Sequence, residues 1–252
     1  MRDIVFYFVM LHHGDWNKIY QSIKNKERID EVKLEEFKRI NKRPYLTLLD
    51  ADYPDCLKQV ERPPYLLFYE GDLSLLKEEK RLTVVGTRKM SSYGQQMTAS
   101  LVRDLVSEGF TIISGLACGV DGVAHRTALA NSGKTIAVVA NGLDIKYPFS
   151  NRELYQEIAE KGLILSEYPD GVPAEPLSFH FRNRLVAGLG QAVLVTEAYY
   201  RSGTLITVRH ALEQGKDVYC VPARADEKSV CNKLIRDCAY LVEEAKDIEL
   251  SI

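Results

Sequence analysis

The chain has 252 residues, of which 46% are hydrophobic and 27% charged, and its formal net charge at pH 7 is −2. Its length and composition suit an ordinary globular protein with one large domain and a small one. The near-neutral charge excludes a general attraction to nucleic acid, so such a partner requires a local basic cluster. No apolar run reaches the roughly 18 residues that cross a bilayer, and residues 5–10 precede no cleavage site, so we expect a cytoplasmic protein without a membrane partner.

The first predicted unit is a small helical module over residues 1–44. Apolar residues recur there at helical spacing, and the pattern stops at Pro44. Residues 45–80 contain several Pro and Gly turn signals around short extended pieces such as residues 65–69. We interpret them as a linking segment that packs on the main domain.

Residues 81–252 alternate strands with helices. Continuous apolar strands between amphipathic helices favour an α/β fold with a mostly parallel, doubly wound sheet whose two faces are covered. In such a Rossmann-like domain the binding crevice lies at the carboxyl ends of the strands. The strands are expected at residues 82–85, 111–113, 135–140, 163–166, 192–196 and 218–221. The helices are expected up to about residue 107 and at residues 123–130, 152–160, 183–189, 205–214 and 233–242.

Three of the expected strand-to-helix loops are rich in Gly, Ser and Arg. They cover residues 86–94, 114–122 and 200–204. Glycine lets the backbone approach a ligand closely, and free N–H groups at a helix start attract an anion such as phosphate. The alternative is that these glycines only form tight turns, which are common in such loops.

Familiar nucleotide and metal motifs are missing from the sequence. In the loop at residues 86–94, only Gly86 falls on the three positions where a dinucleotide fingerprint needs glycine. The triplet 133–135 resembles the end of a phosphate loop, but it leads into a strand, whereas a phosphate loop leads into a helix. NAD and ATP are therefore not expected. The five cysteines form no Cys-x-x-Cys pair and the histidines show no metal-ligand spacing, so we expect neither a metal nor another cofactor.

The segment 179–184, Phe-His-Phe-Arg-Asn-Arg, is the strongest nucleic-acid signal. Arginines grip phosphates in a bidentate way, and aromatic side chains stack on unpaired bases. Its alternative interpretation is a solvated helix start with Phe179 and Phe181 in the core.

Candidate catalytic residues are few. Asp121 and His125 have i, i+4 spacing, but no nucleophile motif accompanies them, and capping of a helix by Asp121 is favoured. Glu197 ends a buried strand and is a candidate general base, while a structural hydrogen bond to the turn at residues 202–204 explains it equally well.

A series of short motifs follows in a fixed order along the chain. They are Tyr53-Pro54, Val84-Val85-Gly86-Thr87-Arg88, Ser114-Gly115-Leu116-Ala117, Gly119-Val120-Asp121, Tyr147-Pro148, Ser166-Glu167-Tyr168-Pro169, Arg182-Asn183-Arg184, Glu197-Ala198 and Ser202-Gly203-Thr204. Over about residues 45–240 the chain thereby resembles the DprA/Smf family, with too many motifs in one order for coincidence.

The resemblance implies an extended Rossmann-like fold and a protein that binds single-stranded DNA, protects it, and loads RecA on it during natural transformation and recombination. It also implies a homodimer without enzymatic turnover. In that picture Arg88 pairs with a phosphate at a helix start while an aromatic side chain stacks on a base. The DNA contacts assigned in this way are Gly86, Thr87, Arg88, Ser114, Gly115, Gly119, Lys146, Phe149, Arg182, Asn183, Arg184 and Arg201.

The chain departs from the family pattern at several positions. Phe149 stands where some relatives carry Lys, and His180 stands where Pro is usual. Val230 and Cys238 replace glycines, which removes backbone freedom in the region that family dimers use. Longer relatives also carry a C-terminal winged-helix module, which we expect to be absent here.

A rival hypothesis is a nucleotide-processing enzyme, because cytokinin-activating phosphoribohydrolases use a related fold with a catalytic Glu. Their Pro-Gly-Gly-x-Gly-Thr-x-x-Glu pattern is missing. The nearest segment covers residues 201–204, and Val208 stands four residues after Thr204 where the acid is required. A binding protein is therefore favoured over an enzyme.

Overall fold

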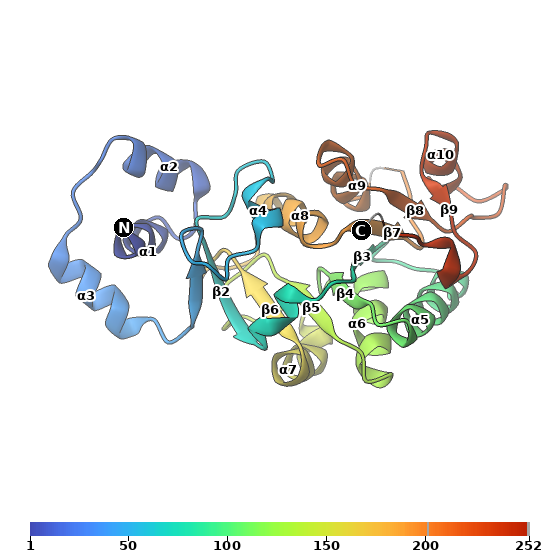
Figure 1. Cartoon of the computed structure of the whole chain (residues 1–252), viewed down its shortest axis with the longest axis horizontal. Helices are drawn as coiled ribbons and strands as arrows, with labels where there is room; N and C mark the ends of the chain where they lie inside the picture. Colours follow the sequence, from blue (N-terminus) through green and yellow to red (C-terminus); the bar gives the residue numbers. More distant parts are fainter. Residues whose placement is uncertain (201, 251–252) are drawn as a thin grey trace.

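A nine-stranded sheet runs through the part of the chain that the computed structural model describes, residues 1–200 and 202–250 (Figure 1). Its strand order is β1-β2-β6-β5-β4-β3-β7-β8-β9. The strands are β1 (Tyr45–Thr47), β2 (Leu66–Gly71), β3 (Arg81–Val85), β4 (Thr111–Ser114), β5 (Thr135–Val138), β6 (Leu163–Ser166), β7 (Ala192–Val195), β8 (Val218–Cys220) and β9 (Tyr240–Leu241).

Pairing is parallel from β6 through β9 and antiparallel at β1 and β2. The helices are α1 (Arg2–Leu11), α2 (Trp16–Lys24), α3 (Glu31–Ile40), α4 (Asp55–Lys58), α5 (Ser92–Ser107), α6 (Val120–Ala130), α7 (Arg152–Lys161), α8 (Pro176–Leu189), α9 (Thr204–Glu213) and α10 (Cys231–Arg236). The predicted α/β fold with a mostly parallel sheet is confirmed.

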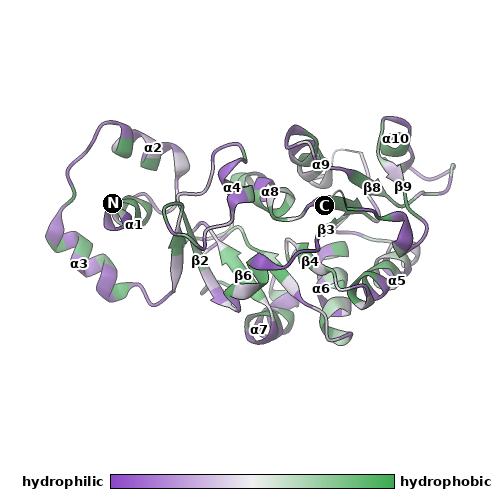
Figure 2. Cartoon of the chain, in the orientation of Figure 1, coloured by the Kyte–Doolittle hydropathy of each residue, from purple (hydrophilic) through white to green (hydrophobic). Residues whose placement is uncertain are grey.

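Both faces of the sheet are covered. Helices α5, α6 and α7 lie on one face, and α4, α8, α9 and α10 lie on the other (Figure 1). Successive residues of β3 point to opposite faces: Val84 packs in the cluster under α5 and α6, and Val85 packs in the cluster under α8 and α9. The strands β4 to β8 are rich in hydrophobic residues and are buried along their whole length (Figure 2).

The N-terminal helices sit beyond the β2 end of the sheet (Figure 1). Helix α1 is largely buried, and its Phe6 ring stacks on Tyr45 of β1 with the ring centroids 4.9 Å apart. The segment 45–80 adds β1 and β2 to the sheet edge, where β2 pairs with β6. Among the described residues no helix combines the length and the apolar content of a membrane span.

Helix α8 begins at Pro176, seven residues before the predicted start. Pro176 occupies the first turn, where its missing N–H costs nothing, and Glu175 and Ser178 form a capping box. The prediction missed this start because the residues around it have a composition that is typical of a loop. The segment 179–184 therefore lies within a helix, and the position expected for it at a helix entrance is wrong.

The prediction of a last helix at residues 233–242 is also wrong for its second half. Helix α10 ends at Arg236, and the chain then turns into β9. Ala239 N–H donates to the Leu234 carbonyl at 2.8 Å and Cys238 N–H to the Ile235 carbonyl at 3.5 Å, the pair of bonds of a Schellman C-cap. Cys238 holds the left-handed position of that cap at φ +116°.

We predict that Cys238→Gly stabilises the protein by about 1 kcal/mol. A residue with a side chain in this region costs about 1–3 kcal/mol, and the greater freedom of Gly in the unfolded chain offsets part of that gain. Urea denaturation of the two proteins measures the difference. Cys238→Ser is the matched control, because it removes the thiol and retains Cβ. Equal gains in both variants would show that the thiol, and not the backbone, carries the effect.

Candidate nucleic-acid interface

An open crevice of about 910 Å³ lies at the carboxyl ends of β3, β4 and β7. This is the place where a doubly wound sheet binds its ligands. Its lining comes from all three Gly-rich loops and from α8. The main lining residues are Val85, Gly86, Thr87, Arg88, Lys89, Gly115, Ala117, Asp121, Tyr147, Pro176, Phe179, His180, Arg182, Asn183, Val186, Tyr199, Ser202, Gly203, Thr204, Ile206 and Thr207.

Arg88 is an exposed cation at the rim of the crevice, next to the exposed Lys89. Its guanidinium carbon lies 4.9 Å from the centre of the Phe179 ring on α8. Within residues 1–200 and 202–250 it forms no ion pair, so its hydrogen-bond donors face solvent. A guanidinium held over an aromatic ring and still free to donate is arranged to take a phosphate.

Arg182 forms the floor of the crevice. It is buried, and Nη1 donates to the Val138 carbonyl at 2.8 Å, while Nε has no partner among the described residues. Burial lowers the pKa of Arg182 to about 10, with the Asp121 carboxylate opposing that shift, so the guanidinium is charged at neutral pH. Burial also raises the pKa of Asp121. The charged Arg182 guanidinium lies under the crevice, and the Asp121 carboxylate near it offsets part of its charge.

Gly115 packs directly on this floor. A Cβ at position 115 would come within 1.8 Å of Arg182 Nη1. A side chain at this position would therefore have to displace the buried guanidinium. The packing of Arg182 accounts for the glycine at position 115. The sequence alone does not indicate this reason.

Arg184 lies away from the crevice. Its Nη1 and Nη2 each donate to Glu167 at 2.6 Å, and its Nε and Nη2 donate to the carbonyls of Glu61 and Arg62. The side chain is 3% exposed. Although burial opposes its charge, the Glu167 carboxylate raises the pKa of Arg184. These Arg184 nitrogens donate to groups of the protein itself. Because Arg184 belongs to a buried ion pair with Glu167, its position argues against a role as a DNA contact.

Carboxylates of the protein lie near the starts of α5 and α6. Ser91 Oγ accepts the Gly94 N–H at the start of α5, and Glu197 Oε2 accepts the Ser91 N–H at 2.9 Å. In the loop before α6, Asp121 accepts the Ala117 N–H at 3.3 Å, and no side chain caps that helix. Each carboxylate repels a phosphate. The two carboxylates oppose the binding of phosphate by free N–H groups at these helix starts, which stays a prediction.

Four other predicted residues act as scaffold around the crevice. Thr87 N–H donates to the Glu197 carbonyl, and the Thr87 carbonyl accepts from Val120 N–H. Ser114 is buried with its Oγ donating to the Val84 carbonyl at 2.6 Å. Gly86 and Gly119 are packed so closely against neighbours that a Cβ would clash at 2.5 Å and 2.2 Å. These residues hold the loops in which Arg88 lies.

An aromatic rim continues from Phe179 along the loop after β5. Tyr147 and Phe179 have ring centroids 5.7 Å apart, and a small pocket opens between them, Arg88 and the loop at residues 115–118. Phe149 is 72% exposed with the Arg152 guanidinium 4.6 Å from its ring centre. Arg152 therefore brings a cation to the position where some relatives carry Lys after Tyr-Pro.

The remaining predicted residues are placed less centrally. Lys146 is exposed, with its ammonium 5.7 Å from the Tyr155 ring centre. Asn183 lines the crevice, and its Nδ2 lies 3.4 Å from the Gly203 carbonyl. Arg201 lies outside the described residues.

The candidate catalytic groups are engaged elsewhere. His125 is buried and its Nδ1 bonds Thr135 at 2.7 Å, while burial lowers its pKa to about 3. Its neighbour Asp121 accepts the Ala117 N–H in the loop before α6, and because no side chain caps this helix, the capping expected of Asp121 is wrong. Glu197 bonds Ser91 and the hydroxyl of Tyr199, not the turn at residues 202–204. None of these bonds forms an acid–base pair that faces the crevice.

Three residues of the rim are missing from the DNA contacts that the resemblance implies. Tyr147 belongs to one of the family motifs, Phe179 belongs to the segment 179–184, and Arg152 is expected only as part of a helix. All three lie beside the crevice or the exposed Phe149. The sequence signals for these residues are the Tyr-Pro pair and a Phe close to basic residues. Only the fold shows that the loop after β5 and helix α8 lie side by side.

Comparison with known proteins identifies the family. Residues 44–251 match the family model of DNA recombination-mediator protein A. The DNA processing protein DprA of Streptococcus pneumoniae is 43% identical over 225 residues, covering 88% of this chain and 78% of the relative. Protein Smf of Synechocystis is 43% identical over 214 residues, covering 83% of this chain and 54% of the relative, so the chain spans about half of that longer protein.

Solved structures give the same result. The X-ray structure of DprA from Streptococcus pneumoniae has a TM-score of 0.84 at 39% identity, covering 94% of this chain and 81% of that chain. DNA processing protein A from Helicobacter pylori, whose structure describes a unique single-stranded DNA binding mode, has a TM-score of 0.75 at 34% identity, covering 82% of this chain and 94% of that chain. With its fold, loop motifs and relatives in agreement, the chain belongs to the DNA recombination-mediator protein A family, also called DprA/Smf.

Proposed function

We propose that this chain binds single-stranded DNA across the carboxyl ends of its strands, from Arg88 over the Arg182 floor to the rim at Tyr147 and Phe149. The observation that carries the proposal is the exposed Arg88 guanidinium over Phe179, beside Tyr147. The cation meets a phosphate and the rings meet base faces. The single-stranded DNA binding of the Helicobacter pylori relative supports it.

The arrangement favours a single strand over a duplex. Exposed rings stack on bases whose faces are free, and paired bases hide those faces. Stacking is tolerant of sequence, because every base has a flat face, so we expect little base preference. With a net charge of −2, affinity depends on the local cations Arg88, Lys89, Arg152 and Arg182.

We predict that Arg88→Ala weakens binding of an oligonucleotide about tenfold, because one charge-assisted phosphate contact contributes about 1.4 kcal/mol. The slope of log affinity against log salt should fall by about 0.7, the value for one phosphate of a single strand. Fluorescence anisotropy across a salt series measures both. Arg103→Ala is the control, because Arg103 is an exposed arginine of α5 that pairs with Asp104. Equal affinity of the wild type for single strands and duplex would contradict the proposal.

We further propose that the protein works in the cytoplasm as a homodimer that protects incoming DNA and loads RecA on it. Strand β9 forms an open edge of the sheet with Tyr240 and Leu241 about half exposed, which supports an edge-to-edge pairing of two copies. The solution mass, with and without oligonucleotide, tests the dimer. The rate at which RecA filaments form on the bound strand tests loading, and a rate unchanged by the protein contradicts it.

The rival enzyme proposal has a separate test. Incubation with nucleoside monophosphates and assay of released base detects phosphoribohydrolase activity. We expect no release, because Glu197 is held by Ser91 and Tyr199. Release that Glu197→Gln abolishes would favour the enzyme.

A further inference from the structure

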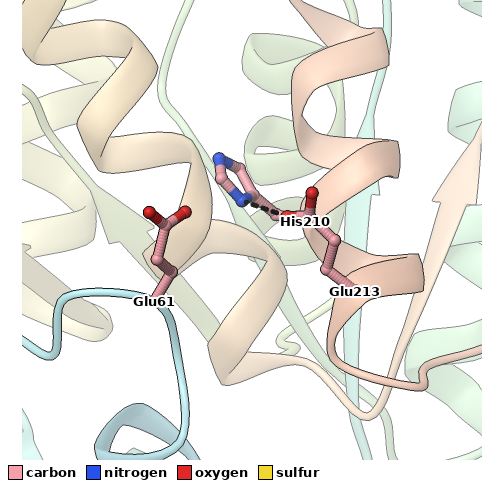
Figure 3. Close-up of side chains that lie close together, drawn as sticks. All are labelled: Glu61, His210 and Glu213. Atoms are coloured by element: carbon pink, nitrogen blue, oxygen red, sulfur yellow. Dashed lines mark ion pairs between the residues drawn. The ribbon is translucent and has the colours of Figure 1, made fainter.

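Three potential metal ligands meet on the α9 side of the sheet, away from the crevice lining. Glu61 comes from the loop after α4, and His210 and Glu213 lie one turn apart on α9 (Figure 3). One donor atom from each lies within 4.8 Å of the other two. His210 Nδ1 is 3.2 Å from Glu213 Oε2. The i, i+3 spacing directs both helical side chains to one face.

We propose that Glu61, His210 and Glu213 bind a divalent transition-metal ion, for which Zn²⁺ is the probe. Zn²⁺ takes imidazole nitrogen and carboxylate oxygen at about 2.0–2.2 Å, so neighbouring ligands of a tetrahedral ion lie about 3.4 Å apart. The His210–Glu213 separation of 3.2 Å is close to that value. Glu61 is exposed, and the proposal requires its carboxylate, whose donor atom lies within 4.8 Å of the other two, to move closer to them.

The surroundings suit a cation. His210 is 7% exposed, so packing holds its imidazole beside the carboxylates of Glu213 and Glu61. Both helical ligands lie in the last turn of α9, where the carbonyl ends of the helix favour positive charge.

Two arginines compete for the same carboxylates, but weakly. Arg62 lies 3.9 Å from Glu61, and Arg209 lies 3.6 Å from Glu213. Both ion pairs are long and exposed to solvent, where such pairs contribute little. A metal ion with direct bonds to the oxygens therefore displaces them at small cost.

A bound ion would link two parts of the chain that are distant in sequence. Glu61 belongs to the segment that carries β1 and β2, whereas the first turn of α9 lines the crevice. The sequence indicated no metal because two of the ligands come from one helix and the third from a remote loop. A metal ion bound by these three side chains would stabilise the fold and would not contact DNA.

The test is a Zn²⁺ titration of the full chain against a colorimetric chelator. It uses a Cys118→Ser/Cys238→Ser background, because both of these thiols are exposed and bind Zn²⁺ themselves. We expect one Zn²⁺ per chain, and binding about tenfold or more weaker in Glu61→Gln and Glu213→Gln. Since the ion binds only the folded chain, Zn²⁺ should also raise the melting temperature of the background protein and not of Glu61→Gln.

Glu157→Gln is the matched control, because it removes an exposed helical carboxylate that pairs with Lys161 on α7. It should bind Zn²⁺ like the background protein. Glu61 is exposed, so its variant folds and a loss of binding is not a loss of structure. If the background protein binds Zn²⁺ no more tightly than Glu61→Gln, the three side chains are a histidine–carboxylate ion pair with a neighbouring acid, and the proposal is overturned.

Discussion

Arg184→Met is expected to lower the free energy of unfolding by about 3–5 kcal/mol, the usual cost of leaving one partner of a buried ion pair alone. The side chain of Glu167 is only 10% exposed and receives both terminal nitrogens of Arg184. The carbonyls of Glu61 and Arg62 lose their donors in the same variant. Urea denaturation followed by circular dichroism measures the loss.

The double variant Arg184→Met/Glu167→Leu separates the ion pair from simple packing. Removing both charges restores much of the stability, because replacing a whole buried pair with apolar residues is often neutral. Oligonucleotide affinity of folded Arg184→Met should equal that of the wild type. A variant with normal stability and affinity reduced as in Arg88→Ala would instead make Arg184 a DNA contact, as the motif suggested.

The two arginines of the 182–184 motif show where sequence reasoning reached its limit. Side chains two positions apart on a helix point about 200° apart, so Arg182 faces the crevice and Arg184 faces Glu167. The helix was expected to start at residue 183, which left the orientation of Arg182 unspecified. With the true start at Pro176, the same periodicity separates the two roles.

The strands β3 to β8 and most helices were predictable because their signals are local. Alternating apolar strands and amphipathic helices from residue 81 onward gave the sheet and the crevice position, and Arg88 was found in its loop. The partners that decide what each polar group does were not predictable. Glu197 reaches Ser91, and Arg182 lies under Gly115, and both contacts join segments far apart in the chain.

Gly119→Ala is expected to cost about 2–6 kcal/mol of unfolding free energy and to weaken oligonucleotide binding as well. Gly119 has φ +80°, and a Cβ there would lie 2.2 Å from the Thr87 carbonyl oxygen and 2.8 Å from the Arg88 backbone. Strain in this region costs about 1–3 kcal/mol, and forcing an extra carbon into a packed site costs about 1–3 kcal/mol more. The loop that carries Arg88 must move to relieve the clash.

Gly109→Ala is the matched control for this variant. Gly109 follows α5 with φ +84° and has open space around its Cβ position, so the substitution adds only backbone strain of about 1–2 kcal/mol. Denaturation and anisotropy on both variants separate strain from displacement of the loop. Binding that falls in Gly119→Ala and is unchanged in Gly109→Ala means that the packing of the α6 start against residues 87–88 sets the position of Arg88. Normal binding by a folded Gly119→Ala variant would contradict that link, and the Arg88 loop would then be positioned by its contact with Phe179 alone.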